Sequence, residues 1–395
     1  MNRRFYLLLM ILIHPTMKLA AQELTFSGYY ENQFFPQELN GKLILQDYNK
    51  VRLDLSADIG ENISFHADYV YRVFHGATKF SAFDFIPERV VRTYAELLQT
   101  PVGSLRPLFA FELENENFLD NAFVTLYFDH LNFRVGKQQL PWGTGYSWNP
   151  TDIFNDKNLL DPTYEKVGVN AFKVEVPFGS EGMLTGILGI GEDWNSSIKA
   201  VKVKQHIHGF DLSASFVEKT QEGFDYTLAS ALSEKRRLVG GDFSGQLFGL
   251  GVWGEGAYNV MEDSENYGQY LLGTDYTLES GLYLTGEYYK NELGKADKSQ
   301  YDFNDWMRLL SADGENLGRD YLFLGERYAI TELWNWANYL LINLNDKSGL
   351  VFPWFDYSFN DNTELMFVGY IPLGSKDTEF GEFGAGGFVR VKVFF

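Results

Sequence analysis

The sequence predicts an all-β fold, a transmembrane antiparallel up-and-down β-barrel of about 18 strands. Apolar and polar residues alternate with a period of two along most of the chain, as in strands whose two faces meet different surroundings. No stretch approaches the roughly 18 consecutive apolar residues of a membrane-spanning helix. Aromatic residues make up 17% of the chain and 38 glycines outnumber 11 prolines, a composition typical of strands joined by tight turns.

The first 21 residues have the layout of a secretory signal peptide. Arg3 and Arg4 precede an unbroken apolar run, residues 5–13, which is too short to span a bilayer as a helix. Two alanines follow, and we expect cleavage after Ala21, which leaves 22–395 as one outer-membrane β-barrel domain. The chain has no cysteine, so its stability must come from backbone pairing and packing.

The C-terminal segment shows the alternation most clearly. Val389, Val391 and Val393 share one face of an extended chain, whereas Arg390 and Lys392 share the other. A soluble sandwich would hide the valines behind a second sheet. In a membrane barrel the apolar face meets lipid and the charged face meets an aqueous lumen.

The same pattern recurs along the chain and predicts eighteen strands. They are 24–35, 42–58, 62–74, 120–128, 132–139, 165–176, 182–190, 197–205, 210–218, 235–244, 249–260, 267–277, 281–291, 321–330, 334–345, 349–359, 363–373 and 385–395. Sixteen strands would remain if 235–244 and 321–330 are not strands, and twenty would result if 90–115 adds a pair.

The connections between these strands differ in length in a regular way. If the N-terminus lies in the periplasm, every periplasmic turn is short and rich in turn formers. The long or acidic connections then all fall on the extracellular side, at 75–119, 140–164, 219–234, 261–266, 292–320 and 374–384. This sorting supports both the even strand number and the orientation.

A barrel of this size predicts a channel. An unpaired strand edge in hydrocarbon costs several kcal/mol per backbone group, so the first and last strands must pair. Barrels of about 16–18 strands leave an aqueous channel. We therefore expect a bacterial outer-membrane pore for small hydrophilic solutes, surrounded by lipid and lipopolysaccharide. Without the signal peptide, the chain has 30 basic and 53 acidic residues. The resulting net charge of −23 argues against nucleic acid as a partner.

The polar faces of the strands give the candidate pore-lining residues. The basic ones are Lys50, Arg52, Arg72, Arg134, Lys173, Lys202, Lys204, Arg390 and Lys392. The acidic ones are Asp54, Asp68, Glu175, Asp211, Glu287 and Asp356. The pairs Lys202/Lys204 and Arg390/Lys392 form two-step basic ladders that would guide anions or sugar acids. The alternative is that these bases pair with carboxylates on neighbouring strands.

The most distinctive local motif follows the fifth predicted strand. The motif covers residues 135–154: the strand ends at Gln139, and an aromatic- and glycine-rich loop then begins, in which Asp152 is placed to cap a turn through an Asx-type bond. Trp142, Tyr146 and Trp148 would line a constriction and stack on sugar faces. Alternatively, they belong to an interfacial girdle or pack the loop against the barrel wall.

This motif also carries a resemblance to a known group. The block Gly136-Lys-Gln-x-x-x-Trp142-Gly143, followed by Asn149-Pro150-x-Asp152, resembles a signature of porin-like outer-membrane proteins. One such family is described as a domain of unknown function, in a clan with phosphate-selective and alginate-export porins. Members of this clan also tend to carry segments similar to residues 241–244 and 255–258 and an aromatic C-terminal residue like Phe395. The resemblance implies a passive or selective pore with no catalytic residues, although Lys137 stands where the pattern expects Arg.

The sequence leaves two other function classes open. A barrel plugged by its long loops would bind polysaccharide or a protein partner, as capsule-associated lectin barrels do. An outer-membrane hydrolase would need a Ser, His and Asp brought together from separate strands. The sequence has no Gly-x-Ser-x-Gly, HExxH or phosphate-loop motif, so no enzyme, cofactor or metal site is predicted.

Overall fold

The computed structural model describes residues 21–155, 167–311 and 316–395. The predicted signal peptide lies outside these ranges except for Ala21. The first two residues of the predicted strand 165–176, and part of each of the predicted loops 140–164 and 292–320, also lie outside the described residues.

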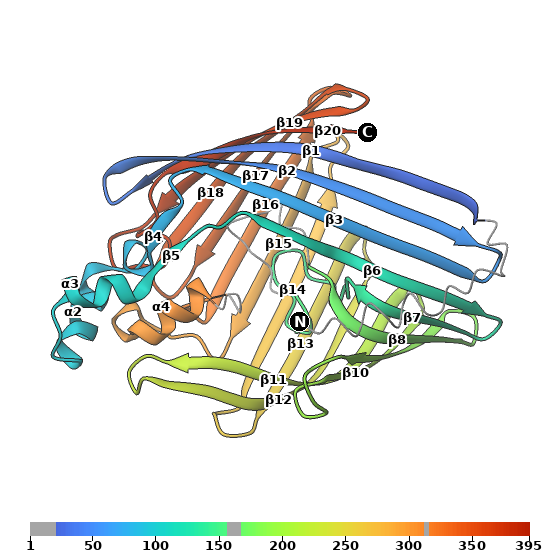
Figure 1. Ribbon diagram of the computed structural model, residues 1–395, viewed down its shortest axis with the longest axis horizontal. Coiled ribbons are helices and arrows are strands. Elements are labelled where there is room, and N and C mark those ends of the chain that lie inside the picture. Colours follow the sequence, from blue (N-terminus) through green and yellow to red (C-terminus); the bar gives the residue numbers. More distant parts are fainter. Residues whose placement is uncertain (1–20, 156–166, 312–315) are drawn as a thin grey trace.

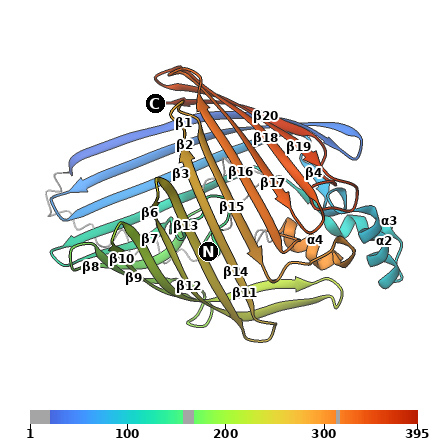
Figure 2. The same ribbon diagram turned by 180° about the vertical axis from the view of Figure 1, so that it is seen from behind.

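Eighteen antiparallel strands form one closed barrel (Figures 1 and 2). Each strand pairs with its neighbours in sequence, and β20 pairs with β1. The strands are β1 (Ala21–Leu39), β2 (Lys42–Ile59), β3 (Ile63–Gly76), β6 (Glu116–Phe128), β7 (Leu131–Gln138), β8 (Val169–Phe178), β9 (Gly182–Gly189), β10 (Ile198–Ile207), β11 (Phe210–Asp225), β12 (Ser230–Leu247), β13 (Leu250–Met261), β14 (Tyr267–Thr277), β15 (Tyr283–Asn291), β16 (Asp320–Ala329), β17 (Trp334–Asn343), β18 (Ser348–Asn360), β19 (Thr363–Leu373) and β20 (Gly386–Phe394). The predicted fold class, strand number and strand order are confirmed.

The seam between the two chain ends closes the sheet. Asn32 of β1 lies opposite Val391 of β20. Beyond the paired strands, Gly28 and Phe395 exchange two backbone hydrogen bonds of 3.0 Å. The edge strands are therefore satisfied by each other, as a barrel in hydrocarbon requires.

The two ends of the barrel differ as the connection lengths predict. One end carries only short turns, the longest being residues 278–282 between β14 and β15. The opposite, outer end carries the long connections and the helices of the described residues (Figure 1). The prediction of an outer loop at 219–234 is wrong. β11 and β12 continue through most of this segment and leave only residues 226–229 as a turn. Both faces of this extension carry polar residues, so the alternation gave no sign of it.

The outer surface of the barrel wall is apolar. Leu24, Val239 and Leu272 point outward and are 66%, 56% and 61% exposed. Their neighbours along each strand face the interior. Such an apolar belt is typical of a barrel whose outer wall contacts lipid. None of the helices in the described part of the chain is long and apolar enough to cross a bilayer.

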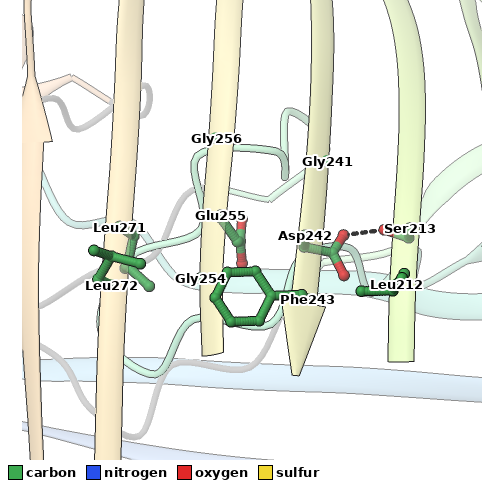
Figure 3. A pocket seen from close by; sticks show the side chains of 10 residues that line it. All are labelled: Leu212, Ser213, Gly241, Asp242, Phe243, Gly254, Glu255, Gly256, Leu271 and Leu272. Carbon is green, nitrogen blue, oxygen red and sulfur yellow. Dashed lines mark hydrogen bonds between the residues drawn. The ribbon is translucent and has the colours of Figure 1, made fainter. Parts of the chain in front are cut away.

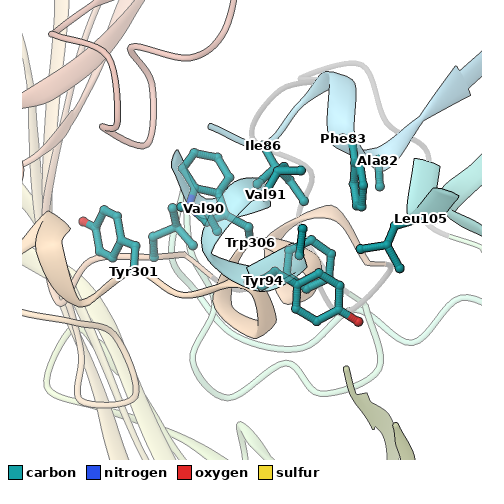
Figure 4. Packing of buried hydrophobic residues seen from close by; sticks show 12 residues of the cluster. Ala82, Phe83, Ile86, Val90, Val91, Tyr94, Leu105, Tyr301 and Trp306 are labelled. Carbon is teal, nitrogen blue, oxygen red and sulfur yellow. The ribbon is translucent and has the colours of Figure 1, made fainter. Parts of the chain in front are cut away.

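Two long outer connections pack against each other at the outer end. The β3–β6 connection holds β4 (Lys79–Ser81), η1 (Ala82–Asp84), α2 (Glu88–Leu97), α3 (Val102–Leu105), η2 (Arg106–Phe109) and β5 (Ala110–Glu112), and the β15–β16 connection holds η3 (Lys298–Gln300) and α4 (Phe303–Leu310). Tyr94 of α2 stacks on Phe303 of α4, with ring centroids 3.8 Å apart. Trp306 of α4 is fully buried in the same apolar cluster (Figure 4). We call this unit the outer cap.

Candidate functional site

The connection between β7 and β8 folds into the barrel. Its described N-terminal part, residues 139–155, is called the inner loop below. Its apolar residues pack on lumen-facing residues of β8 to β18, including Leu238 and Leu341. These contacts leave the lumen faces of β20, β1, β2, β3 and β6 as the opposite side of the interior.

Two buried carboxylates hold the inner loop against the wall. Glu255 on β13 accepts hydrogen bonds from the backbone N–H groups of Gly145 at 2.7 Å and Thr151 at 3.1 Å. Glu287 on β15 accepts one from the backbone N–H of Ser147 at 2.6 Å. The two glutamates are only 5% and 1% exposed. A buried carboxylate is stable only where hydrogen bonds replace its water, so these bonds fix both the glutamates and the loop.

Both loop tryptophans are buried. Trp142 is 5% exposed and contacts Phe154 within the loop. Trp148 is 6% exposed, stacks on Tyr289 at 4.9 Å and donates its indole N–H to Asn316 at 3.0 Å. Their ring faces are therefore occupied by protein, in agreement with the alternative that they pack the loop against the wall.

The turn in the inner loop has the geometry that its sequence predicts. The backbone N–H of Asp152 donates to the carbonyl of Asn149 at 3.0 Å. The Asp152 carboxylate then accepts from the backbone N–H groups of Phe154 and Asn155, both at 3.1 Å. Asp152 thus shapes the loop from within and is 7% exposed.

Tyr146 is the exposed aromatic residue of the loop motif. Its side chain is 48% exposed, although its backbone N–H donates to Glu287. Its ring lies 5.4 Å from that of Phe323 on β16 and 6.2 Å from that of Tyr339 on β17. The hydroxyl groups of Tyr146 and Tyr339 are 3.2 Å apart and hydrogen bonded. The rings of Tyr146 and Tyr339 form an aromatic surface on the lumen wall, and Phe323, which is only 7% exposed, packs against both.

Acidic and basic side chains alternate on the opposite side of the lumen. Arg52 on β2 contacts the carboxylates of Asp54 at 2.7 Å, Asp68 at 2.5 Å and Asp120 at 2.8 Å. His66 also contacts Asp68, at 2.7 Å. One guanidinium thus bridges three strands, and its charge is more than balanced locally.

The basic ladder on β20 is paired in the same way. Glu31 on β1 lies 3.8 Å from the Arg390 guanidinium and 3.7 Å from the Lys392 ammonium. Glu31 also accepts a hydrogen bond from the Tyr48 hydroxyl at 2.7 Å and is only 2% exposed. The Lys392 ammonium also lies over the Tyr29 ring, 3.7 Å from its centroid.

Most of the other predicted pore-lining bases also have carboxylate partners. The pairs are Lys173–Glu175 at 2.9 Å, Lys202–Asp242 at 2.9 Å, Lys204–Asp211 at 2.7 Å and Arg72–Glu116 at 3.3 Å. Arg134 instead donates to Thr125 at 3.0 Å and lies over the Phe123 ring, and the ammonium of Lys50 is 5.1 Å from the Tyr29 ring. Three of these four ion pairs join different strands, as the alternative to a basic ladder expects, whereas Lys173 and Glu175 both lie on β8.

A second buried carboxylate cluster lies at the outer end. Glu379, in the β19–β20 connection, accepts a hydrogen bond from the Tyr321 hydroxyl and one of 2.6 Å from the Asn343 amide. Its own backbone N–H donates to Asp346 at 2.7 Å. Burial, reinforced by the nearby Asp346 charge, raises the pKa of Glu379 to about 7 despite these hydrogen bonds.

The outer face of the wall has a shallow depression of about 440 Å³ across β11–β14 (Figure 3). Gly241, Gly254 and Gly256 leave space there, and Leu212 and Leu272 line its apolar sides. These five residues belong to the lipid-facing side of the strands, whereas Ser213, Asp242, Glu255 and Leu271, which also line the depression, belong to the lumen-facing side.

Several residues that shape the lumen were not predicted as site residues. Glu31, Phe323 and Tyr339 lie on ordinary alternating strands, where nothing local distinguishes them from their neighbours. Glu255 had a signal, because it lies in a segment that matches the porin-like pattern. Glu287 was predicted as a pore-lining acid, but it is buried beneath the inner loop.

The fold matches solved outer-membrane barrels. OccAB1 of Acinetobacter baumannii aligns with a TM-score of 0.60 at 10% identity, covering 96% of this chain and 98% of that one. OccAB4 of the same organism gives a TM-score of 0.56 at 10% identity, over 96% and 100%. No family model and no curated protein matches the sequence. By its structure, the chain has the fold of the 18-stranded outer-membrane porins.

Proposed function

We propose that the protein is an outer-membrane channel for the passive diffusion of small hydrophilic solutes. The narrowest part of the path lies between the inner loop and the charged lumen faces of β20, β1, β2, β3 and β6. The observation that carries the proposal is the attachment of the inner loop to Glu255 and Glu287, because a loop fixed inside a large barrel narrows the lumen without adding a catalytic group.

The chemistry of the interior supports a role in solute passage. The wall opposite the loop presents charged and hydrogen-bonding groups, with Arg52, Arg390 and Lys392 each beside a carboxylate. Such a surface replaces the water around a polar solute without holding one sign of charge strongly. We also propose, from the loop motif, that the chain is related to the porin-like proteins in the clan of phosphate-selective and alginate-export porins. Nothing in the described residues favours a sealed barrel that binds polysaccharide, and we propose no enzymatic activity.

Single-channel recording tests this function. The mature chain, residues 22–395, would be folded in detergent and added to a planar bilayer in KCl. We expect discrete conductance steps, and we expect neutral polymers above a size limit to be excluded from the open pore. A barrel that is shown to be folded by its heat-modifiable electrophoretic mobility, yet never conducts, would refute the proposal.

A further inference from the structure

The lumen contains an aromatic surface that the attachment of the inner loop does not require. Trp142 and Trp148 already anchor the loop, since both are almost fully buried. The side chain of Tyr146 remains 48% exposed, and its backbone is fixed through Glu287. Leaving an aromatic ring exposed in an aqueous lumen has a free-energy cost, so this placement needs another explanation.

The surface is extended and rigid. The rings of Phe323 and Tyr339 stack with centroids 5.6 Å apart and planes 20° from parallel. Trp354 on β18 meets Tyr339 edge to face at 6.1 Å. Together with Tyr146, these residues form what we call the aromatic platform, which spans the inner loop and β16–β18. The backbone of the platform is held by strand pairing and by Glu287, and its rings pack against one another, so little conformational entropy remains to be lost on binding.

Polar groups surround the platform. The Trp354 indole donates to Asp356 at 2.7 Å, and Arg327 lies over the ring of Tyr283 at 5.0 Å. Arg327 and Asp356 also lie near Tyr339. The Asp275 carboxylate, which accepts a hydrogen bond from the Tyr283 hydroxyl at 2.8 Å, adds a second acid. Charges of both signs therefore surround the platform, and they suit a neutral ligand with many hydroxyl groups better than an anion.

We propose that the aromatic platform is a binding site for the ring face of a neutral sugar within the channel, an inference that rests on the proposed channel function. A pyranose ring presents C–H groups on its faces and hydroxyl groups at its edge. The faces match Tyr146 and Tyr339, and the edge matches Arg327 and Asp356. Apolar surfaces with a few fixed polar groups are typical of small-molecule sites.

Sugar block of the ion current tests the platform. Neutral oligosaccharides, namely maltotriose, cellotriose and chitotriose, would be added to single channels of the mature protein in KCl. We expect at least one of them to reduce the current in a saturable way. Tyr146→Leu, which keeps bulk but loses the ring, should weaken this block by about tenfold. Tyr146→Phe should retain most of it, and Tyr270→Leu on the lipid face is the matched control.

The outcomes separate the two proposals. Channels that conduct but are not blocked by any of the sugars overturn the platform and leave the channel function standing. Block that is unchanged in Tyr146→Leu also overturns the platform, as does block by a planar aromatic solute such as adenine without block by sugars. A folded barrel that never conducts overturns the channel function itself. If Tyr146→Leu fails to fold, sugar block is compared between wild type and Tyr339→Leu instead.

Discussion

At the scale of single residues, the lumen is dominated by carboxylates with structural partners. Glu31, Glu255 and Glu287 are each almost completely buried, and each accepts hydrogen bonds or ion pairs from groups far away in the sequence. Such groups are sensitive sites for mutation, because removing one partner leaves the other buried and unsatisfied.

Glu31 sets the charge balance beside β20. Glu31→Gln removes one negative charge and leaves Arg390 and Lys392 without their carboxylate. We expect the pore to become more permeable to anions, measured as a shift of the reversal potential in a KCl gradient. Glu61→Gln, in the exposed turn between β2 and β3, is the matched control and should leave the reversal potential unchanged. An identical reversal potential in Glu31→Gln and wild type would show that this group lies away from the ion path.

Glu379 makes the outer end sensitive to pH. Its pKa of about 7 in the folded protein lies above the ordinary carboxyl value of about 4.5, so folding favours the protonated form. The stabilisation is fully present below about pH 4.5 and is lost as the pH rises through 7, a change of about 3 kcal/mol. Amide hydrogen exchange of residues 374–385, corrected for intrinsic rates, should therefore be slower at pH 5 than at pH 8.

A neutral variant gives the control for this pH effect. Glu379→Gln cannot ionise, so its corrected exchange rates should be nearly equal at the two pH values. If the variant kept the wild-type difference, the pH sensitivity would have to come from another group in the cluster.

At the scale of elements, the inner loop is the part whose position matters most for passage. Its sequence forms the turn around Asp152 by itself, but its place in the lumen depends on β13 and β15. The strands supply rigid positions for the two glutamates, and the loop supplies backbone N–H groups. We therefore expect few substitutions to be tolerated at Glu255 and Glu287 on the strands, and more to be tolerated at those loop positions whose side chains face water.

Removing both glutamates should release the inner loop. In the double variant Glu255→Ala and Glu287→Ala, several loop N–H groups lose their acceptors, at about 1–3 kcal/mol each where they stay buried. We expect single channels that are larger and noisier than wild type, with a higher polymer size limit. The matched double variant Glu61→Ala and Glu181→Ala removes two exposed acids from the short turns at the other end of the barrel. It should have the same conductance as wild type. Unchanged conductance in the first variant would mean that the loop does not form the narrowest part.

At the scale of the whole molecule, the barrel is defined by two environments. Lipid surrounds an apolar outer face, and a polar lumen lies within, so the same substitution has different effects at different positions. Leu272 lies in the middle of β14 on the outer face and is 61% exposed, whereas Leu228 lies at the tip of the β11–β12 hairpin and is 74% exposed.

These two leucines test the membrane assignment. Leu272→Arg places a charge in hydrocarbon and should lower the free energy of unfolding by about 2–4 kcal/mol, measured by urea titration in phospholipid vesicles. Leu228→Arg should change it by less than about 0.5 kcal/mol, because that residue lies in water. Equal effects at the two positions would contradict the membrane-spanning arrangement.

The sequence by itself determined the barrel, its eighteen strands and the side on which its long loops lie. In each strand, the face that contacts lipid requires apolar residues at alternate positions. This requirement is local, so the pattern can be recognised without reference to the rest of the chain. The signal fails only where both faces meet water, as in residues 219–234, which extend β11 and β12.

Only the tertiary structure decided what fills the lumen. The inner loop meets Glu255 and Glu287 across more than 100 residues, and Glu31 meets Arg390 and Lys392 only because β1 closes on β20. The sequence pattern around a lumen-facing acid is therefore the same whether that acid lies under a loop, beside a basic side chain or in water. Its role is set by closure and by loop folding, which bring distant segments together.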